Sequence, residues 1–152
     1  MNTSILIVCK GNICRSPIAE GLLRKKAALS GKSVYIDSAG TGHWHIGKAP
    51  DPRAIDVAQK NDVDIQDLRA RQVEYADLDR FDQIYTMDED NLSRVRAMAV
   101  TERQFKKIQP LSSVVSSNES EVVDPYKGGQ KDFESVFTYL DTLTTALIST
   151  LT

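Results

Sequence analysis

The residues with the clearest capacity for chemistry lie near the start of the chain, in the stretch Cys9-Lys10-Gly11-Asn12-Ile13-Cys14-Arg15-Ser16-Pro17. A cysteine thiolate is a strong nucleophile, and an arginine presents a planar fork of donors that holds two oxygens of a tetrahedral anion. The loop from Lys10 to Ser16 supplies backbone N–H groups, and Gly11 allows them to turn inward. The spacing therefore predicts a phosphate-binding nest with the Cys9 sulfur at its base.

The flanking segments would position this nest. An apolar run over residues 5–8 precedes Cys9, and apolar residues at helical spacing follow Pro17, so we predict a strand, a loop and a helix with Ser16 as its N-cap. The loop would end at a helix N-terminus, which attracts anions and should hold Cys9 as a thiolate at neutral pH. Attack on a bound phosphomonoester would then form a cysteinyl-phosphate, stabilised by the loop amides and Arg15. The alternative is that Cys9 is only a small buried residue at a strand end.

A second candidate catalytic group stands near the other end, in Asp124-Pro125-Tyr126. Cleavage of a phosphomonoester needs an acid for the leaving oxygen and then a base for the attacking water, and one carboxyl group can serve as both in turn. Asp124 is the candidate for this role. By itself an Asp-Pro-Tyr sequence is also an ordinary opening of a turn, so the assignment depends on the cysteine loop.

Four short apolar strands are predicted at residues 4–8, 34–36, 82–87 and 108–111. Helical patterns follow them, capped by Asp51, Asp88 and Thr101, and a long apolar stripe closes the chain over 133–151. This alternation predicts one α/β domain over residues 1–152, with a four-stranded parallel doubly wound sheet, helices on both faces and a flavodoxin-like strand order. The cysteine loop and Asp124 would then share the carboxyl edge of the sheet. We expect the basic connector 68–72 to be mainly solvated and 112–121 to be a polar surface loop.

The bulk composition excludes several classes of function. The chain has 152 residues, is 41% apolar and carries 19 basic against 21 acidic residues, which predicts no nucleic-acid partner. Two cysteines give neither a disulfide framework nor a zinc set, and His43-Trp44-His45 is more typical of an exposed loop than of a metal site. No apolar run reaches the length of a membrane span, and residues 1–8 are too short for a signal peptide. We therefore expect a cytoplasmic protein.

Three motifs together resemble the low-molecular-weight protein tyrosine phosphatases. They are the cysteine loop over residues 9–17, Asp37-Ser38-Ala39-Gly40-Thr41, and Asp124-Pro125-Tyr126, in the family's order and across nearly the whole chain. The resemblance implies hydrolysis of phosphotyrosine in a protein or kinase substrate, with inorganic phosphate as product and neither a metal nor an organic cofactor.

The resemblance also assigns supporting residues. The loop would be braced by Asn12, Ser16 and Ser38. Members of the family also support the loop with a histidine, where this chain has Leu68, so the resemblance does not assign that support here. Trp44 and Tyr126 would form the walls of a substrate cleft, with Ile13 at its rim; the alternative for Trp44 is packing back on its own domain.

Two other functions use related parts. An arsenate reductase of similar fold would need further cysteines for its disulfide relay, and none follows Cys14. A phosphocysteine carrier of a sugar-transport system would need neither a nest closed by Arg15 nor a distant acid such as Asp124. Cys14 itself lies five residues from Cys9, so the two could bridge after oxidation of Cys9 to the sulfenic acid and make the enzyme redox-sensitive.

Overall fold

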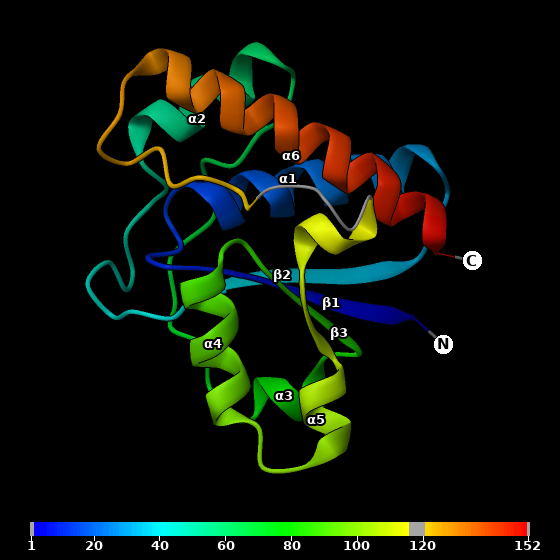
Figure 1. Cartoon of the computed structure of the whole chain (residues 1–152). Coiled ribbons are helices and arrows are strands. Elements are labelled where there is room, and N and C mark those ends of the chain that lie inside the picture. The colour runs from blue at the N-terminus through cyan, green and yellow to red at the C-terminus, as the bar shows by residue number, and fades with distance from the viewer. Residues whose placement is uncertain (1, 116–120, 152) are drawn as a thin grey trace.

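The computed structural model describes residues 2–115 and 121–151. Its centre is a four-stranded sheet in the order β2-β1-β3-β4, in which every neighbouring pair is parallel (Figure 1). The strands are β1 (Thr3–Cys9), β2 (Val34–Gly40), β3 (Gln83–Thr86) and β4 (Ile108–Pro110). This order confirms the predicted doubly wound α/β fold.

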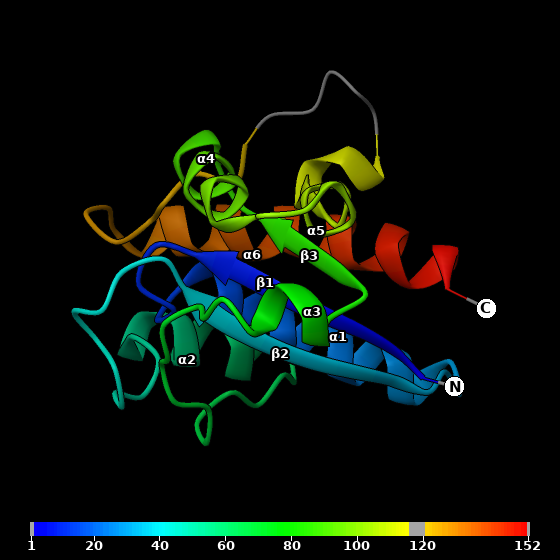
Figure 2. The same cartoon turned by 90° about the horizontal axis from the view of Figure 1, so that it is seen from below.

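Helices cover both faces of the sheet (Figures 1 and 2). One face carries α1 (Arg15–Leu29), α2 (Pro52–Lys60) and α6 (Gln130–Thr150). The other carries α3 (Asp77–Arg80), α4 (Glu89–Met98) and α5 (Glu102–Lys106), and a short 3-10 helix, η1 (Leu111–Val114), follows β4. Among the described helices, none is long and apolar enough to span a bilayer.

The apolar pattern of β1 explains its central place. Ile5, Leu6, Ile7 and Val8 are all fully buried. Successive side chains of a strand point to opposite faces, so Ile5 and Ile7 join the core under α1 and α6, while Leu6 and Val8 join the core under α4. A strand between two layers has no solvated face, and it fixes the position of the loop that follows it.

Three local predictions were wrong. Helix α1 begins at Arg15, with Cys14 rather than Ser16 at the N-cap position, because the Ser16 hydroxyl contacts Cys9 and Asn12 instead of capping. Strand β2 continues to Gly40, four residues beyond its predicted end. Part of the predicted polar loop is η1, and residues 116–120 of that loop lie outside the described residues.

The carboxyl edge of the sheet gathers the segments that carry the predicted chemistry. The loop after β1, the loop after β2 and the segment before α6 lie at this end in both views, opposite the chain termini (Figures 1 and 2). The chain leaves β1 toward β2 on one side and later returns as β3 on the other, so β1 and β3 form a topological switch point. Open α/β sheets bind ligands at such a point.

Candidate active site

Cys9 ends β1 at the bottom of a tightly held loop. Its Sγ lies 3.3 Å from the Asn12 amide nitrogen, which donates to it, and 3.0 Å from the Ser16 hydroxyl. Asn12 has a φ of 58°, a left-handed conformation that asparagine tolerates better than most residues. The Asp51 N–H holds the far side of the loop by donating to the Ile13 carbonyl at 2.8 Å. The loop after Cys9 therefore curls back over its sulfur, and its binding of phosphate stays a prediction.

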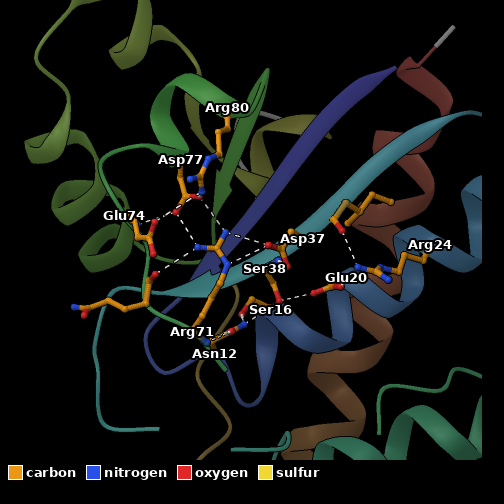
Figure 3. A network of polar contacts seen from close by, with 12 residues as sticks. Asn12, Ser16, Glu20, Arg24, Asp37, Ser38, Arg71, Glu74, Asp77 and Arg80 are labelled. Carbon is orange, nitrogen blue, oxygen red and sulfur yellow. Dashed lines mark hydrogen bonds and ion pairs between the residues drawn. The ribbon is translucent and has the colours of Figure 1, made fainter. Parts of the chain in front are cut away.

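A chain of hydrogen bonds that includes Asn12, Ser16 and Ser38 (Figure 3) fixes the orientation of the Asn12 side-chain amide. The backbone N–H of Arg71 donates to Asn12 Oδ1 at 3.0 Å, so Asn12 Nδ2 must face the other way. Nδ2 donates to Ser16 Oγ at 2.7 Å and to Ser38 Oγ at 2.9 Å. With its oxygen accepting from Asn12, Ser16 has its proton free for a Cys9 thiolate.

Glu20 ends this chain on the other side. Ser38 donates its hydroxyl proton to the Glu20 carboxylate at 2.6 Å, and Arg24 forms an ion pair with the same group at 2.5 Å. Glu20 is buried, and burial raises its pKa, although the bonds from Ser38 and Arg24 oppose that shift. Because Ser38 donates its proton to Glu20, its hydroxyl oxygen is free to accept the hydrogen bond from Asn12 Nδ2.

The prediction that the connector over residues 68–72 is mainly solvated holds for Arg69 and Gln72, which are exposed, but not for Arg71. The Arg71 guanidinium bonds Asp37 at 3.1 Å and both oxygens of Asp77 at 3.0 and 3.1 Å. Asp77 is fully buried, and the Arg71 carbonyl also accepts from the Gly40 N–H. Leu68 packs against the apolar core. Arg71 thus anchors the backbone N–H that braces Asn12.

Gly40 allows the loop and β2 to approach each other closely. A Cβ atom at this position would lie 2.8 Å from the Lys10 carbonyl oxygen and 3.0 Å from the Gly11 carbonyl carbon. Both are backbone atoms, which cannot move aside as a flexible side chain does. The Gly in the Ser38-Ala39-Gly40 motif is therefore a packing requirement of the nest.

Arg15 is buried behind the nest, with 1% of its surface exposed. Its Nη1 donates to Asp88 at 2.6 Å and to the Val122 carbonyl at 2.9 Å, and its Nη2 lies 3.6 Å from an Asp124 oxygen. Burial opposes its charge, but Cys9, Asp88 and Asp124 together hold the pKa of Arg15 above its ordinary value. Arg15 is therefore a fixed cation beside the sulfur.

Asp88 has two contacts, of which the sequence predicted one. Its Oδ1 accepts from the Asn91 N–H as the predicted N-cap of α4, and its Oδ2 binds Arg15. In the part of the chain that the structure describes, no three His, Cys, Asp or Glu side chains gather as a metal site would require. The helix-capping pattern already explained an aspartate at position 88, so nothing in the sequence indicated its contact with Arg15.

The Asp124 loop is tied to α2 through Arg53. The Arg53 guanidinium donates to the carbonyl oxygens of Tyr126 at 2.9 Å and Gly128 at 3.0 Å, while Asp51 pairs with the same group at 2.9 Å. That hydrogen bond from Arg53 lowers the pKa of Asp51, against the effect of burial. The Asp124 side chain stays partly open to solvent, at 40% exposed.

These parts surround a cleft of about 340 Å³. Trp44 and Tyr126 both line it and are 57% and 45% exposed, and the Trp44 ring also packs against Gly42 of its own loop. Sequence analysis missed His45, whose ring also lines the cleft, 6.2 Å from the Tyr126 ring centre. Its position beside Trp44 was the available signal. The lining residues are Cys9, Lys10, Gly11, Ile13, Cys14, Arg15, Trp44, His45, Asp124, Tyr126 and Lys127.

Comparison with known proteins matches this site and fold to one family. The family model described as "Low molecular weight phosphotyrosine protein phosphatase" matches residues 4–152. The chain belongs to this family. The low molecular weight phosphotyrosine protein phosphatase of Schizosaccharomyces pombe is 38% identical, over 91% of this chain and 90% of the relative. The low molecular weight protein-tyrosine-phosphatase YfkJ of Bacillus subtilis is 41% identical, over 88% and 85%.

Solved structures agree with this assignment. A crystal structure of a protein tyrosine phosphatase from Entamoeba histolytica, with Hepes in the active site, superposes with a TM-score of 0.91 at 32% identity. The match covers 97% of this chain and 96% of that one. The chain is therefore a phosphatase of the hydrolase class that the sequence motifs indicated, and its substrates are phosphoproteins.

The second cysteine of this phosphatase is chemically unlike the first. Cys14 and Cys9 are both free and buried, but Cys14 lies at the start of α1 rather than at the base of the nest. Burial, followed by the negative charges of Asp51 and Cys9, raises the pKa of Cys14 far above its ordinary value. Cys14 is therefore a neutral thiol at physiological pH.

Proposed function

We propose that this chain hydrolyses phosphotyrosine in proteins, using Cys9 as nucleophile, Arg15 as phosphate-binding cation and Asp124 as acid and then base. One observation carries the proposal: a single cleft brings the Cys9 sulfur together with Arg15 and Asp124, which lies 109 positions beyond Arg15 in the chain. The partners would be phosphotyrosine proteins, such as kinases or their substrates, and the cytoplasmic location expected from the sequence stays a prediction.

The two steps follow from these positions. The Cys9 thiolate attacks phosphorus, so that an S–P bond forms while the ester P–O bond breaks, and Asp124 gives its proton to the departing phenolate oxygen. A water molecule then attacks the cysteinyl-phosphate and passes a proton to the Asp124 carboxylate. The S–P bond breaks, and inorganic phosphate leaves. The loop amides from Lys10 to Ser16 and Arg15 stabilise the equatorial oxygens in both steps, and neither step requires a metal or an organic cofactor.

The cleft above the nest favours an aromatic ester. Trp44 and Tyr126 offer ring faces at its mouth, and Ile13 offers a branched apolar surface at its rim. A phosphotyrosine ring would replace water on these surfaces, whereas the short stem of phosphoserine would leave them uncovered. We therefore expect phosphotyrosine to be preferred over phosphoserine.

Family membership supports the phosphatase over the two other functions that the sequence left open. Both the matched family model and the relatives compared above carry the name of a phosphotyrosine phosphatase. A phosphocysteine carrier would hold its phosphoryl group for a partner, whereas Asp124 beside Arg15 is placed to activate water.

The decisive test replaces Cys9 by Ser. We expect no measurable hydrolysis of para-nitrophenyl phosphate, because a serine hydroxyl in this nest is far less ionised than a thiol. Inorganic phosphate should still bind, since the amides and Arg15 remain, and isothermal titration calorimetry measures this. Hydrolysis that survives in Cys9→Ser would falsify the nucleophile assignment. Loss of phosphate binding in a correctly folded variant would contradict the role of the loop amides and Arg15 in holding phosphate.

A further inference from the structure

Two lysines at the cleft have no ion-pair partner among the described residues. Lys10 and Lys127 both line it, and both are exposed. Among the described residues, neither has a carboxylate within ion-pair distance nor a hydrogen-bond acceptor for its ammonium group. By contrast, the nearby cations Arg15 and Arg53 are bound to Asp88 and Asp51. The chain as a whole is slightly acidic, with a net charge of −2, so the protein has no overall positive field that would account for a preference at the cleft.

Each lysine lies next to one of the two aromatic residues that line the cleft. The Lys10 ammonium lies over the Trp44 ring, 5.7 Å from its centre. Lys127 follows Tyr126 within a turn that the Gly128 N–H closes by donating to the Pro125 carbonyl at 2.9 Å. Arg53 fixes that turn through two carbonyl oxygens. Each aromatic wall therefore has a lysine beside it.

We propose that Lys10 and Lys127 select phosphotyrosine peptides with aspartate or glutamate next to the phosphotyrosine. The proposal rests on the function proposed above, since it assigns the residues that flank the phosphotyrosine once its ring lies between Trp44 and Tyr126. The phosphate itself binds Arg15 and the loop amides, so the two lysines remain available for carboxylates outside the nest. Opposite charges across a contact raise association rates and exclude partners of like charge.

The test uses three phosphopeptides that differ only in the residues flanking phosphotyrosine, which are Asp, Ala or Lys. We expect kcat/KM to fall from Asp to Ala to Lys, with about a 10-fold span at low ionic strength, given the modest worth of each exposed charge pair. The span should shrink to about 2-fold at 0.5 M salt, where charges are screened within a few ångströms.

Three variants assign the effect. Lys127→Gln should reduce the Asp-to-Lys ratio, and Lys127→Glu should bring it to unity or invert it. Lys131→Gln, which removes an equal charge from an exposed position outside the cleft, should leave the ratio as in the wild type. Lys10→Gln should reduce the ratio independently of Lys127.

The outcomes separate this proposal from the function beneath it. If the wild type cleaves none of the peptides and no free phosphotyrosine, the proposed function is wrong. If it cleaves all three peptides with equal kcat/KM, or if Lys127→Glu keeps the wild-type ratio, the phosphatase stands and the two lysines do not select acidic peptides. If Lys131→Gln reduced the Asp-to-Lys ratio as much as Lys127→Gln, the preference would come from the net charge of the protein and the proposal would be wrong.

Discussion

At the scale of single residues, environment rather than residue type decides what a side chain can do. Cys9 receives the Asn12 N–H and the Ser16 hydroxyl at its sulfur, whereas Cys14 is buried beside the negative charge of Asp51. Burial near negative charge keeps Cys14 a thiol. Two cysteines of one loop therefore have different surroundings, and only the Cys9 sulfur faces two hydrogen-bond donors.

Replacement of Asp124 by Asn tests the acid role. An alkyl phosphate releases a strongly basic alkoxide and needs the proton, so its kcat/KM should fall by about 100-fold or more. Para-nitrophenolate leaves without a proton, so kcat/KM for para-nitrophenyl phosphate should fall much less. The measurement is kcat/KM against leaving-group pKa for wild type and variant. Equal losses along the series would show that Asp124 acts in another way.

Cys14 should protect the nucleophile from irreversible oxidation. After peroxide converts Cys9 to the sulfenic acid, attack by Cys14 would form a disulfide and release water, and a dithiol would restore activity. Cys14→Ser should instead proceed to the sulfinic acid and stay inactive. Because the pKa of Cys14 is raised, bridge formation should accelerate as pH rises above neutral. Mass spectrometry of quenched samples distinguishes the products; equal recovery of both proteins contradicts the role.

At the scale of elements, the connector between α2 and α3 supports the nest from outside. Arg71 joins Asp37 in the middle of β2 to Asp77 at the start of α3, and its backbone N–H orients Asn12 (Figure 3). Leu68, where the family resemblance leads us to expect a histidine, is apolar and packs against the core. Support for Asn12 therefore comes from a backbone group that one arginine holds in place.

Arg71→Met should weaken both the fold and the reactivity of Cys9. The Asp77 carboxylate would stay buried without its two-point partner, which costs about 3 kcal/mol of unfolding free energy. Asn12 would lose its fixed orientation, so iodoacetamide should alkylate Cys9 more slowly at pH 7. Arg71→Lys keeps the charge and should lose less. Arg69→Met, in the same connector but exposed, is the control; an unchanged alkylation rate in Arg71→Met would leave Arg71 a stabilising role only.

The sequence predicted the elements well because their signals are local. A continuous apolar run marked β1, the stripe from Phe133 onward marked α6, and Asp51 and Asp88 marked helix starts that the structure confirms. The contacts that were missed join distant positions, such as Arg15 with Asp88, which are 73 residues apart. The predicted strand order brings these loops to one edge of the sheet, but it does not say which side chains of the loops meet there.

At the scale of the whole molecule, folding buries the carboxyl group of Glu20 between a helix and the sheet. Glu20 lies inside α1 and faces the end of β2, where Ser38 donates to it (Figure 3). Helix α1 is in turn covered by α6, through contacts such as the ion pair between Lys26 and Asp141. The Glu20 carboxylate orients the hydrogen-bond chain to Cys9, but its burial removes the water that would solvate its charge, which costs folding free energy.

This cost should appear in the pH dependence of stability. Burial raises the pKa of Glu20 in the folded protein above the ordinary value of 4.5. Below pH 4.5 the group is neutral in both states. As pH rises, the unfolded chain ionises first and gains stability relative to the fold, until the folded Glu20 ionises as well. The free energy of unfolding of the wild type, minus that of Glu20→Gln, should therefore fall across this window, by about 1.4 kcal/mol for each unit of pKa displacement.

Urea denaturation of both proteins between pH 4 and pH 8, with about one pH unit between points, measures this difference. Glu134→Gln, at an exposed position of α6, is the matched control and should give a difference that does not change with pH. A flat difference for Glu20→Gln would mean that Arg24 and Ser38 compensate the burial of Glu20 completely. A falling difference would mean that the orientation of the donors at Cys9 is maintained by a group that weakens the fold at the pH where the enzyme works.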